Sequence, residues 1–150
     1  MCCVNYLSNI RSLTQNVIIL SGDVPFIKKT TIDNVSNNCI NANILAIKLD
    51  NPTGYGRLVM NNNNLQKIVE EKDCRENERT INQVNTGIYC FDINILLTYI
   101  EKISDNNNQN EFYLTDIFEI LINNKININV VETNNILEVT GINTQDQLTK

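Results

Sequence analysis

Short apolar runs separated by polar, Asn-rich segments set the pattern of this chain. Residues 17–20 form one such run, which ends in a Ser-Gly-Asp-Val-Pro turn, and residues 43–50 form another after the polar stretch 28–38. Apolar runs of this length are typical of strands buried on both faces of a parallel sheet. The stretch between them predicts a helix with Thr30 or Thr31 as its N-cap. This part of the chain therefore predicts a βαβ unit.

The middle of the chain alternates polar and apolar residues instead. Residues 57–73 place two alternating segments around a tip at 61–64 that consists only of Asn. Because Asn tolerates the left-handed backbone conformation, this pattern predicts a β-hairpin. Residues 83–92 are rich in β-branched and aromatic side chains and predict a further strand.

Helical spacing of apolar residues follows that strand. It predicts helices over residues 93–103 and 113–124, whereas residues 126–132 and 136–142 predict two last strands, and 143–150 begin another helix. Strands alternate with helices through much of the chain. We therefore expect one domain over residues 1–150, of the α/β class, with a mixed, mostly parallel sheet and helices on both faces.

Charge and composition exclude several classes of function. The 17 acidic and 12 basic residues give a net charge of -5, which is the wrong sign for binding nucleic acid. No apolar run approaches the roughly 20 residues of a membrane span, and the N-terminus lacks the features of a signal peptide, so we expect a cytoplasmic protein. The five cysteines include no CxxC pair, and we expect reduced thiols. The absence of histidine removes the commonest general base.

Two pairs of residues suit ligand binding at strand ends. Asp23 follows the first strand, where a carboxylate can hold a divalent cation or can simply close a turn. An amide oxygen of Asn143, after the last predicted strand, can complete such a cation site. Gly54 and Gly56 leave the backbone uncovered, which allows a ligand to approach closely but also suits a bulged strand entry.

For several further polar residues, the sequence leaves both a ligand-binding and a structural interpretation open. Glu70 and Glu71 are adjacent on a predicted strand, so that at most one of them faces a site. Asn85 can bind sugar hydroxyls or satisfy a neighbouring turn. Tyr113 and Thr115 open a predicted helix, where they can meet an anion or provide a plain cap.

Six motifs taken together are more specific than any one of them. In order, LSGDVPFI, NPTGYGR, IVEEKD, NTGIYCFD, NEFYLTDI and EVTGIN resemble the N-terminal nucleotidyltransferase domain of bacterial N-acetylglucosamine-1-phosphate uridyltransferase, from about residue 17 onward. The resemblance implies a Rossmann-like, GT-A-like fold. It also implies uridylyl transfer from UTP to N-acetylglucosamine 1-phosphate, which yields UDP-N-acetylglucosamine for peptidoglycan and lipopolysaccharide synthesis, and pyrophosphate.

The same resemblance assigns roles to single residues. It implies that Asp23 and Asn143 hold Mg²⁺, and that no other residue has a catalytic role, because positioning and charge neutralisation carry this reaction. The substrate-binding residues that it implies are Gly22, Gly56, Glu70, Asn85, Tyr113 and Thr115.

Departures from the family are also visible in the sequence. The Gly-rich phosphate loop with its Arg, a downstream Lys, the uracil-recognising motif and the acetyltransferase β-helix domain have no counterpart in these 150 residues, and Asn110 replaces a Gly. We therefore expect a partial domain that lacks the first βα units, is inactive alone, leaves an apolar edge at residues 17–20 and depends on a separately encoded N-terminal segment. Alternatives are a non-catalytic remnant, a sugar-phosphate-binding module, or a nucleotidyltransferase for another sugar 1-phosphate.

Overall fold

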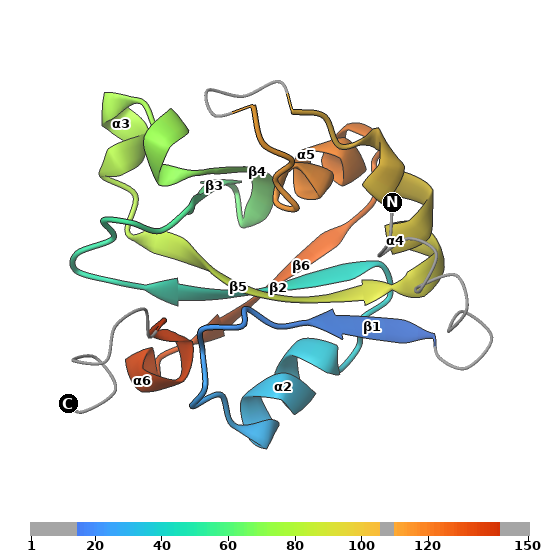
Figure 1. The fold of residues 1–150 in the computed structure, drawn as a ribbon, viewed down its shortest axis with the longest axis horizontal. Helices are drawn as coiled ribbons and strands as arrows, with labels where there is room; N and C mark the ends of the chain where they lie inside the picture. The colour runs from blue at the N-terminus through green and yellow to red at the C-terminus, as the bar shows by residue number, and fades with distance from the viewer. Residues whose placement is uncertain (1–14, 106–109, 142–150) are drawn as a thin grey trace.

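The computed structural model describes residues 15–105 and 110–141, which form one sheet with helices on both faces (Figure 1). The strands are β1 (Asn16–Ile19), β2 (Ala42–Lys48), β3 (Arg57–Asn61), β4 (Asn64–Val69), β5 (Gln83–Asp92) and β6 (Ile128–Thr133). The α-helices are α2 (Lys29–Ser36), α3 (Glu76–Arg79), α4 (Ile93–Tyr99), α5 (Asp116–Asn123) and α6 (Ile136–Val139), and the 3-10 helices are η1 (Glu71–Asp73) and η2 (Ile100–Lys102).

The sheet is mixed, as expected, but antiparallel pairing dominates it. The strand order is β4-β3-β5-β2-β6, and β1 pairs with β5. Among the described residues only β2 and β6 pair in parallel, whereas β5 lies antiparallel to β1, β2 and β3. The expectation of a mostly parallel sheet was therefore wrong, because most neighbouring strands pair antiparallel. The βαβ pattern predicts β1 and β2 in the same direction, but β5 is inserted between them.

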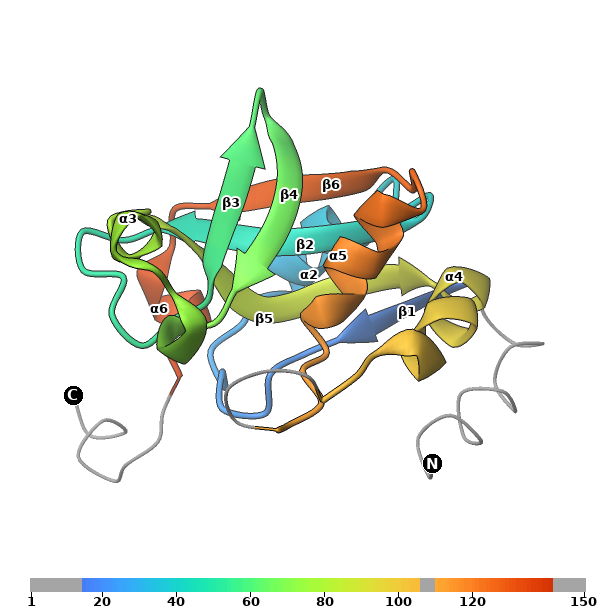
Figure 2. The ribbon, with the colours of Figure 1, turned by 90° about the horizontal axis from the view of Figure 1, so that it is seen from above.

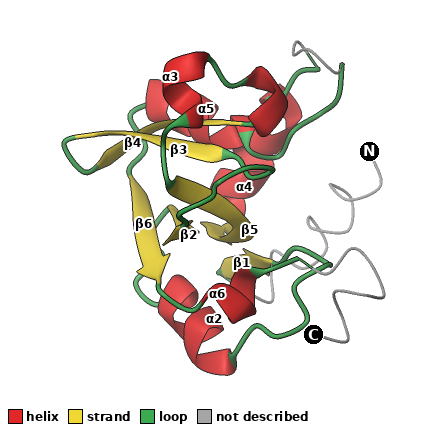
Figure 3. Ribbon diagram, turned by 90° about the vertical axis from the view of Figure 1, so that its left-hand side faces the viewer, coloured by secondary structure: helices red, strands yellow, loops and turns green. Residues whose placement is uncertain are grey.

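Helices cover both faces of the sheet (Figure 3), and an apolar cluster lies on each face. On one face Phe91 packs with Phe118 and Leu121 of α5, and on the other Ile47 and Ile88 pack in one cluster with residues of α2 and α6. Because side chains alternate along a strand, a strand covered on both faces needs apolar residues at every position. This explains why β2 is apolar at five of its seven positions and is buried over six of them.

Several expected elements are confirmed. The hairpin β3–β4 turns at Asn62 and Asn63, whose φ angles of 47° and 65° are the left-handed values that Asn accommodates. Figure 2 shows the hairpin rising away from the rest of the sheet. The expected strand 83–92 matches β5 in its bounds. Asp92 then begins α4 by accepting hydrogen bonds from the backbone N–H groups of Asn94 and Ile95.

Two local predictions were wrong for one shared reason. Residues 136–139 form the short helix α6 rather than a strand, and α2 begins after Lys28 rather than at a Thr cap. The buried carboxylate of Glu138 in α6 accepts hydrogen bonds from the Thr31 hydroxyl and, at 3.3 Å, from the Lys28 backbone N–H. The hydroxyl expected to cap α2 is therefore engaged by α6, and this contact overrides the β-branched pattern.

The edge of the sheet at β1 exposes apolar side chains, as the sequence predicts. Within residues 15–105 and 110–141, β5 is the only strand that pairs with β1. Ile18 is 37% exposed and Leu20 is 42% exposed. In the same part of the chain, no helix has the length and apolar character needed to cross a membrane.

Candidate active site

A gap along one edge of β5 creates the site. On that edge β1 pairs with the end of β5, where Ile19 lies opposite Tyr89, and β3 pairs with its beginning, where Arg57 lies opposite Val84. Both strands are antiparallel to β5, so the residues after β1 and those before β3 approach each other beside residues 85–88. One backbone hydrogen bond, from the Asn85 N–H to the Gly56 carbonyl at 2.8 Å, joins β5 to the residue before β3 at one border of this gap.

The strand itself bends at the gap. Pairing of β5 with β2 changes register between Ile44 and Ala46, and Gly87 has a φ angle of 75°. A Cβ atom added to Gly87 would lie 3.1 Å from the Cβ of Ser21. Glycine at this position therefore permits both the backbone turn and the close approach of the segment that follows β1.

A cavity of about 450 Å³ occupies the gap. Five segments that are distant in sequence contribute to its walls, namely the loop after β1, the loop before β3, the residue after β4, the bend in β5 and the end of α6. The lining residues are Ser21, Asp23, Val24, Thr53, Gly54, Tyr55, Gly56, Glu70, Asn85, Thr86, Gly87, Val139, Thr140 and Gly141. Four of the predicted site residues, Asp23, Gly56, Glu70 and Asn85, thus meet in one cavity.

Asp23 presents a carboxylate to this cavity. Its Oδ1 accepts a 2.6 Å hydrogen bond from the Ser21 hydroxyl, which is its one protein partner in the described part of the chain. The second oxygen has no protein partner among residues 15–105 and 110–141. Residues 15–105 and 110–141 contain no cluster of three acidic or thiol groups that would enclose a metal. One carboxylate is nevertheless compatible with Mg²⁺, which is usually held by one or two carboxylates together with waters and substrate phosphates.

Asn85 is held by its own strand while it lines the cavity. Its Nδ2 donates to the Tyr89 hydroxyl at 2.7 Å, and its Oδ1 accepts from the Gly87 N–H at 3.0 Å. The turn-satisfying alternative is thus present in the structure. An amide has two donors and two acceptor positions, so one of each remains for a ligand. Burial raises the pKa of Tyr89, which keeps its hydroxyl neutral.

Glu70 and Gly56 lie against each other. A Cβ added to Gly56 would lie 3.2 Å from Glu70 Oε2 and 3.3 Å from a methyl group of Ile68. Glu70 Oε1 accepts a 2.8 Å hydrogen bond from the Thr115 hydroxyl. Thr115 is buried, makes no side-chain cap at the start of α5, and is not among the cavity-lining residues. Its contact with the site therefore passes through Glu70.

Tyr113 lines a second cavity, of about 480 Å³, which shares Glu70 with the first. Asp116 and Glu119 also line it. Burial, followed by the nearby charges of Glu119 and Glu70, raises the pKa of Asp116. Tyr113 and Gly56 thus lie on either side of Glu70 rather than in one cavity.

The two remaining predicted residues are placed differently. Gly22 is exposed between the lining residues Ser21 and Asp23, and a Cβ added there would meet no atom within 4 Å. Asn143 lies outside the described residues, although the neighbouring Thr140 and Gly141 line the cavity. Sequence reasoning missed the role of Ser21, and its only local signal is the Ser-Gly-Asp turn itself.

Comparisons with known proteins agree on one family. Residues 4–135 match the family described as Nucleotidyl transferase. The Clostridium botulinum protein named Bifunctional protein GlmU is 46% identical over 136 residues, which are 88% of this chain and 30% of that protein. An Acanthamoeba polyphaga mimivirus protein, named "Probable UDP-N-acetylglucosamine pyrophosphorylase", is 42% identical over 139 residues, 87% of this chain and 54% of that protein.

Solved structures share the fold at much lower identity. The nucleoside-diphosphate-sugar pyrophosphorylase of Vibrio cholerae has a TM-score of 0.66 at 15% identity, over 97% of this chain and 59% of that one. The inositol-1-phosphate CTP transferase of T. maritima has a TM-score of 0.65 at 14% identity, over 95% and 55%. This chain thus spans about 30% of the length of its bacterial relatives and little more than half of the solved structures.

Proposed function

The chain belongs to the nucleotidyl transferase family, and on that premise we propose that its site serves uridylyl transfer from UTP to N-acetylglucosamine 1-phosphate. The products are UDP-N-acetylglucosamine and pyrophosphate. The name of the 42% identical mimivirus relative, which contains UDP-N-acetylglucosamine, supports this choice of sugar. A cytoplasmic role in supplying precursors of the cell envelope follows from the same proposal.

The observation that carries the proposal is the convergence of Asp23, Gly56, Glu70 and Asn85 on one cavity. A sugar needs donors and acceptors close together, and Glu70 and Asn85 supply them beside Gly56, which has no side chain. Thr115 supports Glu70 from outside the cavity. Tyr113 would contact the sugar from the far side of Glu70, and Gly22 would leave the approach to Asp23 open.

The chemistry also agrees with a chain that lacks histidine. The attacking group is a phosphate oxygen, which is already ionised at neutral pH because the second pKa of a phosphate monoester is about 6. No protein base has to remove a proton. The residues of the site therefore act by orienting the sugar phosphate for in-line attack on the α-phosphorus of UTP.

Asp23 would hold Mg²⁺, with Asn143 as the proposed second ligand. The hydrogen bond from Ser21 fixes one oxygen of Asp23, a residue that lines the cavity, and leaves the other without a protein partner among the described residues. When bound, the ion neutralises phosphate charge during transfer. This role predicts that binding of the sugar phosphate to the chain strengthens with Mg²⁺ only while Asp23 is intact.

Isothermal titration of the purified chain with N-acetylglucosamine 1-phosphate, with and without Mg²⁺, tests the proposal directly. We expect Asp23→Ala to remove the Mg²⁺ dependence, and Asp33→Ala, a change in an exposed i,i+4 ion pair with Lys29 on α2, to leave it unchanged. A pyrophosphate-release assay with UTP then separates turnover from binding alone. Equal affinity for N-acetylglucosamine 1-phosphate and inorganic phosphate would contradict the sugar assignment.

A further inference from the structure

The loop before β3 is held by contacts that the proposed chemistry does not use. Residues 53–56 line the cavity, and the loop turns at Gly54, whose φ angle is 90°. Within the loop, the Tyr55 N–H donates to the Pro52 carbonyl at 3.2 Å. The Thr53 N–H also donates to Asn51 Oδ1 at 3.2 Å. Two short-range hydrogen bonds are weak support for a loop that must present its backbone to a ligand, so its contacts with other segments decide its position.

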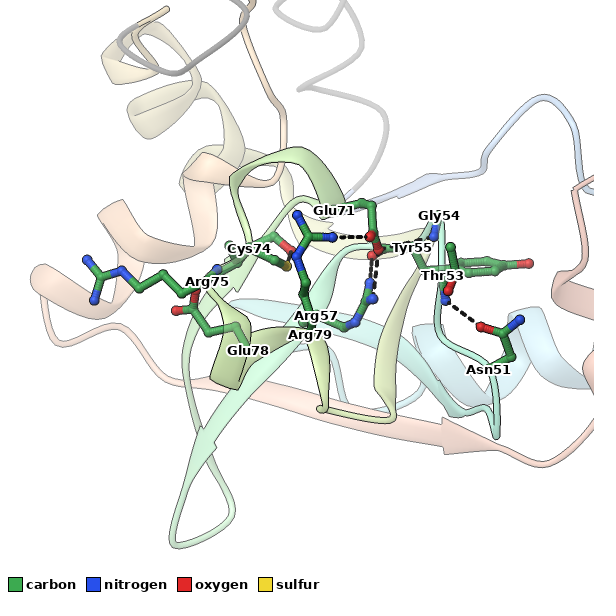
Figure 4. Close-up of polar contacts among 11 residues, drawn as sticks. Asn51, Thr53, Gly54, Tyr55, Arg57, Glu71, Cys74, Arg75, Glu78 and Arg79 are labelled. Carbon is green, nitrogen blue, oxygen red and sulfur yellow. Dashed lines mark hydrogen bonds and ion pairs between the residues drawn. The ribbon is translucent and has the colours of Figure 1, made fainter.

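The hydrogen bond from the Asn85 N–H holds Gly56 at the end of the loop, and Glu71 supplies further contacts (Figure 4). Its Oε2 accepts from the Gly54 N–H at 3.1 Å and from Arg57 Nη2 at 2.7 Å, and its Oε1 accepts from Arg79 Nη1 at 2.7 Å. One carboxylate thus joins the loop, β3 and α3. The hydrogen bond from Arg57, followed by that from the Gly54 N–H, lowers the pKa of Glu71.

Arg57 completes the connection from within the protein. It is 1% exposed, and its Nη1 donates to the carbonyl of Tyr55 while its Nη2 pairs with Glu71. A buried guanidinium is costly unless its charge is paired, so the pair fixes both side chains in one arrangement. Glu71 therefore holds the loop at the Gly54 N–H, and Arg57 holds it at the Tyr55 carbonyl. Because Arg57 and Glu71 are paired, the two contacts are fixed together.

The adjacent residues Glu70 and Glu71 thus have different roles. Glu70 faces the cavity beside Gly56, whereas Glu71 turns away from it, into the ion pairs with Arg57 and Arg79. We infer that Glu71 is a positioning residue that, with Arg57, fixes residues 53–56 so that the backbone of Gly56 meets the sugar phosphate. The identity of the ligand in this inference rests on the proposed function, whereas the fixing of the loop by Glu71 rests on the contacts alone.

A ligand-free measurement tests the holding of the loop. Amide hydrogen exchange of Gly54, followed by NMR in the full chain, reports the hydrogen bond to Glu71. We expect Glu71→Gln to speed this exchange by about tenfold, the factor that corresponds to one charge-assisted hydrogen bond. Arg79→Met is the matched control, since it removes the other partner of Glu71, on Oε1, and leaves the Gly54 contact intact. Unchanged exchange in Glu71→Gln would overturn the inference.

A binding measurement tests the consequence for the ligand. We expect Glu71→Gln to weaken the affinity for N-acetylglucosamine 1-phosphate by about tenfold, and Arg79→Met to change it less than twofold. Exchange of amides in α4, which lies at the other end of the sheet from α3 (Figures 1 and 2), shows whether each variant is folded. If both variants weaken binding equally, or neither does, Glu71 has no positioning role through the loop.

The two measurements also separate this inference from the function on which it rests. If the unsubstituted chain binds no sugar phosphate while Gly54 exchange still responds to Glu71→Gln, the proposed function fails and the holding of the loop stands. If the unsubstituted chain binds and Glu71→Gln binds as tightly, the positioning role fails and the proposed function stands.

Discussion

Substitution of Gly87 by alanine gives the most direct test of how the site is built. The residue has a φ angle of 75°, and an added Cβ would lie 3.1 Å from Ser21 Cβ. A left-handed backbone costs an alanine about 1–2 kcal/mol, and forcing the Ser21 contact apart costs about 1 kcal/mol more. Alanine also reduces the entropy of the unfolded chain, which returns about 0.4–1 kcal/mol. We therefore expect Gly87→Ala to destabilise the protein by about 2 kcal/mol.

Urea unfolding followed by circular dichroism measures this difference, which corresponds to about 6 °C in Tm for a chain of this size. Gly22→Ala is the matched control, because that glycine directly follows Ser21 and its added Cβ would meet no atom within 4 Å. Its stability should stay within about 0.5 kcal/mol of the unsubstituted chain. Equal stability of the two variants would refute the bend in β5 as the structure describes it.

Three further predictions concern the core, an acid-sensitive contact and a thiol. Phe118→Ala removes a fully buried ring that lies 5.2 Å from Tyr89, and should cost about 3–5 kcal/mol in urea unfolding, whereas Phe112→Ala, at a 72% exposed position, should cost less than about 0.5 kcal/mol. The hydrogen bond from the Thr31 hydroxyl lowers the pKa of Glu138. The ionised Glu138 therefore stabilises the protein fully above the ordinary pKa of 4.5, and this stabilisation is lost as the pH falls through the lowered value. Glu138→Gln should be less stable than the unsubstituted chain at pH 7, with a deficit that shrinks below pH 4.5. Burial raises the pKa of Cys74, and mass spectrometry after iodoacetamide treatment should find it unmodified in native protein and labelled in urea.

Elements with a strong local signal could be predicted from the sequence. The hairpin β3–β4 follows from alternating residues around Asn62 and Asn63, because Asn adopts the left-handed conformation that its turn requires. The bounds of β5 follow from its β-branched and aromatic residues, and the Asp at its end caps the next helix. These features depend on residues close together in the chain, and so the sequence is sufficient for them.

The helix α6 shows where local patterns fail. Its residues read as a strand, but the carboxylate of Glu138 is held by groups of α2 that lie more than 100 residues earlier in the chain. The same long-range contact moved the start of α2 away from its predicted Thr cap. No pattern within either segment carries information about the other, since the contact exists only after the sheet has formed.

The candidate site divides in the same way. The residue types that suit a sugar phosphate, such as Asp23, Glu70 and Asn85, were visible in the sequence, because their motifs are short and ordered. Only the tertiary structure decided that they meet in the gap between β1 and β3, and that Glu71 turns to the loop while Glu70 turns to the cavity. The physical reason is that local conformation follows from neighbouring residues, whereas the site depends on the register of strands brought together from distant parts of the chain.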